Sequence, residues 1–409
     1  MMRHVEKAPK KNIFAWNDYV VLFFLFLAAM NFNTWYAYCV FVAFALFLVL
    51  GNTHLRMDSG LVPLIFLSLS ILLFDPYYQD SLTAMLKAFI FPMCYFMGYN
   101  LPSGETDLQG AEKATEKVIF TLALGTWMHL ALNMVSNWSE ESGRNTIDFW
   151  TGSVLSATNQ AALAVMMIGF AIAIFLGSYS FKWKLSAIGL IAVVLIYNLR
   201  LGGRTIFFLA LVALVGGLLY QAVFLRRSKR FFASALAIVV LLGLVLWAYT
   251  QNLFGIQDFV VNSNFYERFF GEQSLELDDD GRLEKKLKYL PKLFTYPWGG
   301  AHIREEIGGY AHDLYLDTYD EAGLFAFAFV IVLVIGAIRK MLIVLRSQTV
   351  GRNTKLLLAC VFLVLNIEFW VEPILAGVPW LLACFCVIYG ATARLSRLSR
   401  RNRIVESVS

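Results

Sequence analysis

The sequence is dominated by long apolar runs that alternate with short connections in which the charged residues are concentrated. A helix that crosses a bilayer needs about 20 mostly apolar residues, because its backbone polar groups must be satisfied within the helix itself. Only 15% of the residues are charged and 59% are hydrophobic, so a water-exposed surface of ordinary composition is excluded. The chain is therefore predicted to be an all-α, multi-pass membrane protein.

Twelve apolar runs approach the length of a membrane span, although the second and the seventh are short. They lie near residues 15–31, 35–50, 60–75, 80–100, 117–136, 158–178, 185–199, 205–225, 231–250, 314–338, 354–371 and 376–393. We therefore expect about 12 transmembrane helices. Helices 1–9 would occupy residues 1–250, and helices 10–12 with a basic tail would occupy residues 313–409.

The lysine and arginine residues predict the orientation, since cytoplasmic connections keep positive charge. With the N-terminus inside, 23 of the 34 basic residues fall in connections on the cytoplasmic side. The short external connections hold Arg144, Arg200 and Arg204. Both termini are therefore predicted to be cytoplasmic. The same distribution argues against nucleic acid as a partner, because the basic residues lie in short clusters between spans rather than on one soluble surface.

The five cysteines lie in apolar sequence, where a thiol behaves as a small hydrophobic group. Cys384 and Cys386 have no histidine nearby, so neither a disulfide framework nor a metal site is expected. The chain also lacks a glycine-rich nucleotide-binding motif. We therefore predict no cofactor.

The connection at residues 251–312 is too long for a simple hairpin and contains ten acidic and seven basic residues. It is predicted to be an external subdomain before the tenth span. Apolar residues recur at helical spacing in 267–270 and 283–294, which predicts short amphipathic helices at the membrane surface. The turn-forming segment 297–300 then interrupts the pattern.

Arg200 and Arg204 lie at the external end of a tight helical hairpin. Gly202 and Gly203 allow the backbone to turn, so that Arg204 can direct a guanidinium group at an anion. The alternative is an arginine whose side chain merely extends to the membrane interface. Arg268 and Arg304 in the long connection are further phosphate-binding candidates, as is Arg282, although most charged residues of this loop are typical of a solvated, self-paired surface.

His312 opens the tenth span and is followed by four acidic residues at helical spacing. A histidine can act as a base near neutral pH, and a neighbouring carboxylate can orient it. The alternative is a histidine that caps the helix, with Asp313 and its neighbours as partners of the helix dipole. Glu368 and Glu372 lie near the external end of the eleventh span, where they can orient an arginine or contact sugar hydroxyls. Pro373 predicts a broken helix there.

The stretch Gly309-Tyr-Ala-His312-Asp-Leu-Tyr-Leu-Asp-Thr-Tyr-Asp-Glu-Ala-Gly323 resembles the signature of the bacterial O-antigen ligase and polysaccharide polymerase superfamily. That signature is a histidine, then usually an amide or serine, nine residues and a glycine; Asp313 departs from it here. The turn at 296–300 is similar to the turn that precedes the family's histidine. Gly203-Arg204-Thr205 resembles its arginine-containing hairpin, and Gly281-Arg282 resembles the arginine early in its long loop.

The resemblance implies transfer of a glycan from an undecaprenyl diphosphate carrier to an acceptor sugar hydroxyl, without an essential metal. It places the protein in the bacterial inner membrane, with its active site facing the periplasm or exterior. In this hypothesis Arg204 and Arg282 bind the diphosphate, and His312 removes the acceptor proton with inversion at the anomeric centre. Tyr310 and Tyr315 would line the sugar path, unless they are interfacial belt residues.

The acceptor distinguishes two versions of this reaction. A polymerase extends a second lipid-linked repeat, with a chain-length regulator as a further implied partner, whereas a ligase uses lipid A-core. The run at 312–317 resembles the polymerases more closely, so polymerase is the favoured prediction. A transporter or flippase is a third class, in which Lys87, Glu368 and Glu372 would gate a pathway. The sequence lacks the internal symmetry that many transporters have.

Overall fold

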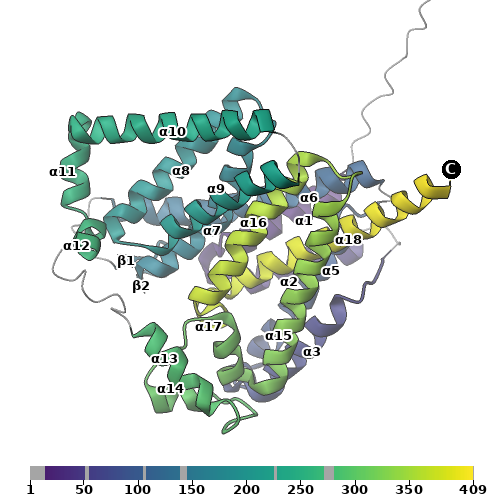
Figure 1. The fold of residues 1–409 in the computed structure, drawn as a ribbon. Coiled ribbons are helices and arrows are strands. Elements are labelled where there is room, and N and C mark those ends of the chain that lie inside the picture. The colour runs from purple at the N-terminus through teal and green to yellow at the C-terminus, as the bar shows by residue number, and fades with distance from the viewer. Residues whose placement is uncertain are drawn as a thin grey trace, which may run out of the picture.

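The computed structural model describes residues 14–50, 55–104, 107–138, 145–224, 228–270 and 281–408. These residues form helices, apart from one short antiparallel hairpin of β1 (Thr146–Ile147) and β2 (Val154–Leu155), which the sequence did not predict (Figure 1). The expected cytoplasmic position of residues 1–13 lies outside the described residues. The all-α prediction is confirmed for the part that is described.

Eight helices are long and apolar enough to cross a membrane, so the chain is a multi-pass membrane protein. They are α6 (Leu108–Ser136), α7 (Ala157–Leu176), α8 (Phe181–Leu201), α9 (Thr205–Val223), α10 (Ser228–Thr250), α15 (Leu314–Arg346), α16 (Arg352–Val371) and α18 (Pro379–Val408). The first three predicted spans correspond to shorter apolar helices of 14 or 15 residues, namely α1 (Trp16–Ala29), α2 (Tyr36–Leu50) and α3 (Leu61–Phe74). The count of twelve therefore stays a prediction.

The fourth predicted span, at residues 80–100, is not one helix. It divides into α4 (Leu82–Lys87) and α5 (Ile90–Asn100), and a short 3-10 turn, η2 (Pro76–Gln79), precedes them. Pro92 explains the break, since it has no N–H to donate to the carbonyl of Ala88 and its ring clashes with that carbonyl in a continuous helix. Lys87 lies in the last turn of α4.

Several helices extend beyond their apolar runs. The helix α6 begins nine residues before the predicted span, and α18 continues through the basic tail to Val408. Lysine, arginine and glutamate are good helix formers, so the end of an apolar run does not end the helix. The predicted break at Pro373 is confirmed, because α16 ends at Val371 and a separate short helix, α17 (Ile374–Gly377), follows.

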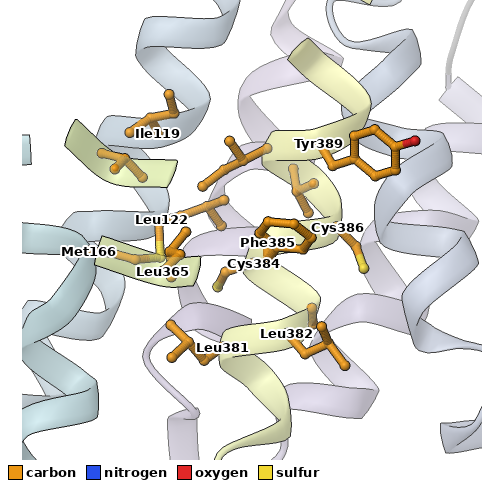
Figure 2. Packing of buried hydrophobic residues seen from close by; sticks show 14 of the residues in the cluster. Ile119, Leu122, Met166, Leu365, Leu381, Leu382, Cys384, Phe385, Cys386 and Tyr389 are labelled. Carbon is orange, nitrogen blue, oxygen red and sulfur yellow. The ribbon is translucent and has the colours of Figure 1, made fainter. Parts of the chain in front are cut away.

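The core lies where α7 and α18 pack against their neighbours. Figure 2 shows Phe385 of α18 among buried side chains that include Met166 of α7 and Leu365 of α16. A Cβ atom on Gly98 would lie 2.0 Å from the carbonyl oxygen of Val387, so the backbones of α5 and α18 are in direct contact. All five cysteines are free and buried in this interior.

The helix α10 differs from the other seven long helices because none of the residues in its apolar stretch is buried. It runs from α9 to α11 along one side of the molecule (Figure 1). Its outward residues include Phe232, Leu236, Val239 and Trp247. In a membrane this surface faces lipid.

The long connection forms short helices, as predicted. They are η3 (Leu253–Gly255), α11 (Ile256–Val261), α12 (Asn264–Phe270), α13 (Arg282–Tyr289), η5 (Leu290–Lys292) and α14 (His302–Ile307). Four apolar side chains at helical spacing are exposed along one face of α13 and its continuation, namely Leu283, Leu287, Leu290 and Phe294. The predicted amphipathic helix at 283–294 is therefore present in α13 and η5.

Candidate active site

The tenth span is interrupted at Gly323, where the backbone adopts φ 79° and ψ −174°. The segment that contains Pro297 lies against this break. The carbonyl oxygen of Pro297 accepts a hydrogen bond of 2.8 Å from the amide of Leu324. A Cβ atom on Gly299 would lie 2.6 Å from the nitrogen of Gly323, so only glycine fits there. The structure therefore joins two motifs that the sequence analysis identified separately, the turn at 296–300 and the glycine of the histidine signature.

His312 lies on the turn that precedes α15, half-buried, with φ 60° in the left-handed region. A histidine is rarely found there, and such a conformation persists only where the surroundings impose it. The carboxylate of Asp317 supplies that constraint. Its two oxygens accept hydrogen bonds from the amides on either side of His312, 2.8 Å from Ala311 and 3.0 Å from Asp313. Asp317 is therefore a positioning residue for His312, and not merely a partner of the helix dipole.

Asp313 is the residue that caps α15. Its Oδ1 atom accepts hydrogen bonds from the amides of Tyr315 (3.0 Å) and Leu316 (2.7 Å). The alternative interpretation of His312 as the cap is therefore wrong. Burial raises the pKa of Asp313, and the backbone bonds and Lys286 offset only part of that effect. An asparagine at this position could accept the same two backbone bonds.

The helix α13 brings Arg282 and Lys286 to the His312 turn. The Nζ atom of Lys286 lies 3.2 Å from Oδ2 of Asp313 and donates a 2.6 Å hydrogen bond to the carbonyl of Trp370. Arg282 is one turn earlier, on the same face, and donates through Nη1 to the carbonyl of Val371 at 2.9 Å. Both cations thus contact the last carbonyls of α16, and Lys286 also reaches Asp313, the residue next to His312.

Lys286 was not among the predicted site residues, because the sequence analysis treated the charged residues of this loop as a solvated surface. That interpretation holds for two of its neighbours. Lys288 pairs with Glu284, and Lys292 pairs with Glu306. The spacing of four residues from Arg282 is the signal that distinguishes Lys286, since it places both side chains on one helix face.

Glu368 and Glu372 are buried one helical turn apart at the end of α16. The Oε1 atom of Glu372 lies 3.2 Å from Nη1 of Arg282, so the prediction that these carboxylates orient an arginine is confirmed for Glu372. Glu368 has an exposed fraction of 0%, and neither of its carboxylate oxygens has a hydrogen-bond partner among the described residues. A second buried carboxyl group therefore lies one helical turn from the pair of Arg282 and Glu372.

Two tyrosines close to His312 in the sequence, Tyr310 and Tyr315, pack on different neighbours. The ring of Tyr310 has its centroid 6.4 Å from that of His312, and the guanidinium of Arg304 lies 4.5 Å from the centre of the same tyrosine ring. Tyr315 packs on Trp370 with a centroid distance of 4.6 Å. Tyr310 thus joins His312 to Arg304, whereas Tyr315 packs against the end of α16.

Arg304, which lies over the ring of Tyr310, also contacts the acidic residues Asp320 and Glu321 of α15. Its Nη1 atom lies 3.2 Å from Oε1 of Glu321, and Asp320 accepts hydrogen bonds from the amides of Ile303 and Arg304 at 2.9 and 3.3 Å. Asp75, at the end of α3, is a further acidic residue near Arg304. Burial raises its pKa to about 6, even though its side chain accepts a hydrogen bond from the amide of Tyr77.

The variant Asp75→Asn is expected to stabilise the protein above pH 7. The folded-state pKa lies above the ordinary value of about 4, so ionisation of this carboxyl group costs stability that asparagine does not lose, about 3 kcal/mol at most. Asparagine can still accept the bond from Tyr77. The gain in thermal unfolding temperature should shrink as the pH falls through about 6 and vanish near pH 4. Asp80→Asn, at an exposed position nearby, is the control, and a loss of stability in Asp75→Asn at high pH would contradict the assignment.

The remaining predicted arginines form a second group, at the hairpin between α8 and α9. Arg204 donates through Nη2 to the carbonyl of Arg268 at 2.9 Å, and Arg268 donates through Nη1 to the carbonyl of Gly202 at 3.0 Å. Arg200 donates to the carbonyl of Trp138 at 2.8 Å. Gly202 takes φ 70° at the end of α8, as the predicted turn requires. Arg204 and Arg268 fasten α12 to the hairpin, and Arg200 ties the hairpin to Trp138 beyond α6, so these side chains are anchored and do not simply extend to the interface.

A buried pair joins α6 to the segment that follows it. The Nε2 atom of His129 lies 2.7 Å from Oδ2 of Asp148, and both side chains are buried. The pKa of Asp148 is lowered to about 2, because its bonds to His129 and to the amide of Thr151 outweigh the effect of burial. Asn137 also exchanges two hydrogen bonds of 2.8 Å with Ile147, so the hairpin of β1 and β2 is held on α6 by buried polar contacts.

No protein-family model and no curated protein matches this chain. Any function assigned to this protein is therefore based on the residues of the chain itself. Among the described residues there is no group of three or more histidine, cysteine, aspartate or glutamate side chains placed to hold a metal ion. What the site does assemble is a half-buried histidine, two cations and several carboxylates at one end of α15.

The variant Asp317→Asn is expected to lower any activity of His312 by about tenfold or more and to reduce the unfolding free energy by about 1–3 kcal/mol. An amide can accept only one of the two bonds that hold the turn, because its NH₂ group would face the other backbone N–H. Asp313→Asn is the matched control, since it retains the cap. Equal activity in the two variants would show that Asp317 does not position the histidine.

Proposed function

We propose that this protein is a membrane glycosyltransferase that uses an undecaprenyl-diphosphate-linked glycan as its donor. The observation that carries the proposal is the position of His312, on a turn fixed by Asp317 and beside the cations Arg282 and Lys286 of α13. We further propose twelve transmembrane helices in the bacterial inner membrane, both termini in the cytoplasm, and a site that faces the periplasm or exterior.

In this proposal the helix α13 binds the diphosphate of the donor. Arg282 offers a guanidinium fork and Lys286 a compact charge, which together suit the oxygens of a diphosphate. The neighbouring face of the same helix and its continuation exposes the four apolar side chains Leu283, Leu287, Leu290 and Phe294. A helix of this kind lies at a membrane interface and meets a substrate whose diphosphate is there and whose polyprenyl chain is in the lipid. Arg204 and Arg268 supply further positive charge on the same long connection.

The acceptor step is argued from His312. One imidazole nitrogen takes the proton of the acceptor hydroxyl, and the hydroxyl oxygen forms a bond to the anomeric carbon. The bond between that carbon and the diphosphate oxygen breaks, and its electron pair leaves with the diphosphate, whose charge Arg282 and Lys286 stabilise. Attack from the face opposite the leaving group inverts the anomeric centre. Tyr310, Tyr315 and Arg304 are placed to contact the sugars.

We favour a polymerase, in which the acceptor is a second lipid-linked repeat unit. A ligase that uses lipid A-core is the alternative, since both reactions need the same donor chemistry. A transporter or flippase is a second class, and one observation favours it. Glu368 is a fully buried carboxyl group in a spanning helix, without a hydrogen-bond partner among the described residues, and such groups can carry protons in transporters.

The test is a reaction of the purified protein with lipid-linked repeat units, followed by gel separation of the products. A ladder of longer glycans supports a polymerase. Addition of lipid A-core separates the alternatives, because a ligase would transfer a single glycan to it. Movement of the lipid-linked unit across vesicles without any new glycosidic bond would overturn the enzyme proposal in favour of a transporter.

A further inference from the structure

A cavity of about 360 Å³ lies at the end of α15 that is remote from His312, between α15, α18 and the segment that precedes α3. It is lined by Asp58, Lys340, Ser396, Arg397, Arg400 and Arg401. Lys340 is 17 residues beyond the break at Gly323, which corresponds to about 26 Å of continuous helix and approaches the hydrocarbon thickness of about 30 Å. The cavity therefore opens at the opposite face of the membrane.

The lining has a strong excess of positive charge, with one carboxylate against four cations. That carboxylate is already engaged. Asp58 accepts hydrogen bonds from the Tyr95 hydroxyl (2.8 Å) and the amide of Gly60 (3.1 Å), and Lys340 lies 3.2 Å from both of its oxygens. Burial raises the pKa of Asp58, but these bonds and the lysine charge outweigh it and lower the pKa overall. Asp58 thus stays ionised and is satisfied by Lys340, so the arginines carry the excess charge.

The three arginines belong to one face of α18. Arg397 is three and four residues before Arg400 and Arg401, a spacing that aligns side chains along a helix. Arg397 donates a 3.0 Å hydrogen bond to the hydroxyl of Tyr99, which holds its guanidinium at the cavity. Guanidinium groups bind phosphate oxygens in pairs of parallel hydrogen bonds. The cavity is therefore suited to a phosphate-bearing anion.

The surface beside the cavity indicates where that phosphate comes from. The helices α3 and α15 lie side by side, and the rings of Phe66 and Phe329 stack at 5.2 Å between them. Toward the cavity end of these two helices apolar side chains are exposed, among them Val62 on α3 and Leu342 on α15. A soluble phosphate cannot cover such an apolar surface, whereas the acyl chains of a lipid can pack against it.

We propose that this cavity binds the headgroup of an anionic phospholipid, in the leaflet opposite to the candidate active site. The arginines of α18 and Lys340 hold the headgroup phosphate, and the acyl chains lie along α3 and α15. Basic pockets between spanning helices are suited to anionic headgroups in this way. The inference does not depend on the proposed glycosyltransferase activity, because it concerns other residues at the other face.

The experiment is a titration of the purified, detergent-solubilised protein with phosphatidylglycerol, with binding measured by native mass spectrometry. Phosphatidylcholine serves as the zwitterionic lipid. The double variant Arg400→Gln/Arg401→Gln is expected to bind phosphatidylglycerol roughly tenfold more weakly or worse. Arg400→Lys/Arg401→Lys keeps the charge and should keep most of the affinity. The control is Lys182→Gln/Arg339→Gln, which removes the same charge at exposed positions outside the cavity.

Each outcome decides the proposal. Selective loss of phosphatidylglycerol binding in the cavity variant, with thermal unfolding unchanged, supports it. Equal weakening in the control variant would show that general charge attraction is responsible, and wild-type affinity in the cavity variant would place the lipid elsewhere. Complete displacement of the lipid by millimolar inorganic phosphate would reassign the cavity to a soluble phosphate and overturn the lipid assignment.

Discussion

Replacement of His312 by alanine is expected to reduce glycan transfer by about 10²–10⁴-fold, the range that removal of a general base usually costs. The imidazole is half-buried and its backbone is held by the two bonds to Asp317, so it can present a nitrogen to one fixed position. Alanine removes that nitrogen and leaves both backbone bonds in place. The variant leaves the proposed donor site on α13 unchanged, so the binding of lipid-linked donor should change little.

The matched control for His312→Ala is His302→Ala. His302 begins α14 in the same external subdomain, but its side chain is 56% exposed. Glycan transfer by this variant should remain near the wild-type rate. If both variants lose transfer equally, or if His312→Ala retains it, then His312 is not the base, and the proposed reaction must use another group.

Most of the fold that could be predicted from the sequence follows from the constraints of the membrane. A spanning helix must satisfy its backbone internally, so an apolar run such as 158–178 can adopt little other than the helix that is observed as α7. Where charged residues continue a helix into water, this constraint no longer applies. The early start of α6 at Leu108 and the late end of α18 at Val408 could therefore not be predicted from hydropathy.

The site was predictable where a residue acts through its own sequence neighbours. Asp313 caps the helix that it precedes, and Gly202 takes the left-handed conformation that its hairpin requires. Contacts between distant segments were not predictable in the same way. The pair of His129 with Asp148, and the contact of Lys286 with Trp370, depend on how helices meet in space. The spacing of residues along the sequence does not predict those contacts between distant segments.

Arg282→Gln is expected to lower glycan transfer by about 10²–10³-fold, because a donor that stabilises the charge of a leaving group is worth that much. Glutamine can keep a hydrogen bond to the carbonyl of Val371 but leaves Glu372 buried without its cation. Arg282→Lys should be intermediate, since it keeps the charge and loses the paired geometry. Lys288→Gln is the control on the same helix, at an exposed position that pairs only locally with Glu284.

The double variant Arg282→Gln/Glu372→Gln separates the two roles that Arg282 can have. If Arg282 serves only to neutralise the buried carboxylate at 3.2 Å, removal of that carboxylate should restore both thermal stability and transfer. If Arg282 also binds the diphosphate, stability should recover while transfer stays low. We expect the second result, because Arg282 and Lys286 share one face of α13, and Lys286 alone already engages Asp313 beside the histidine. Recovery of transfer in the double variant would reduce Arg282 to a structural role and leave the donor diphosphate to Lys286 and the arginines of the α8–α9 hairpin.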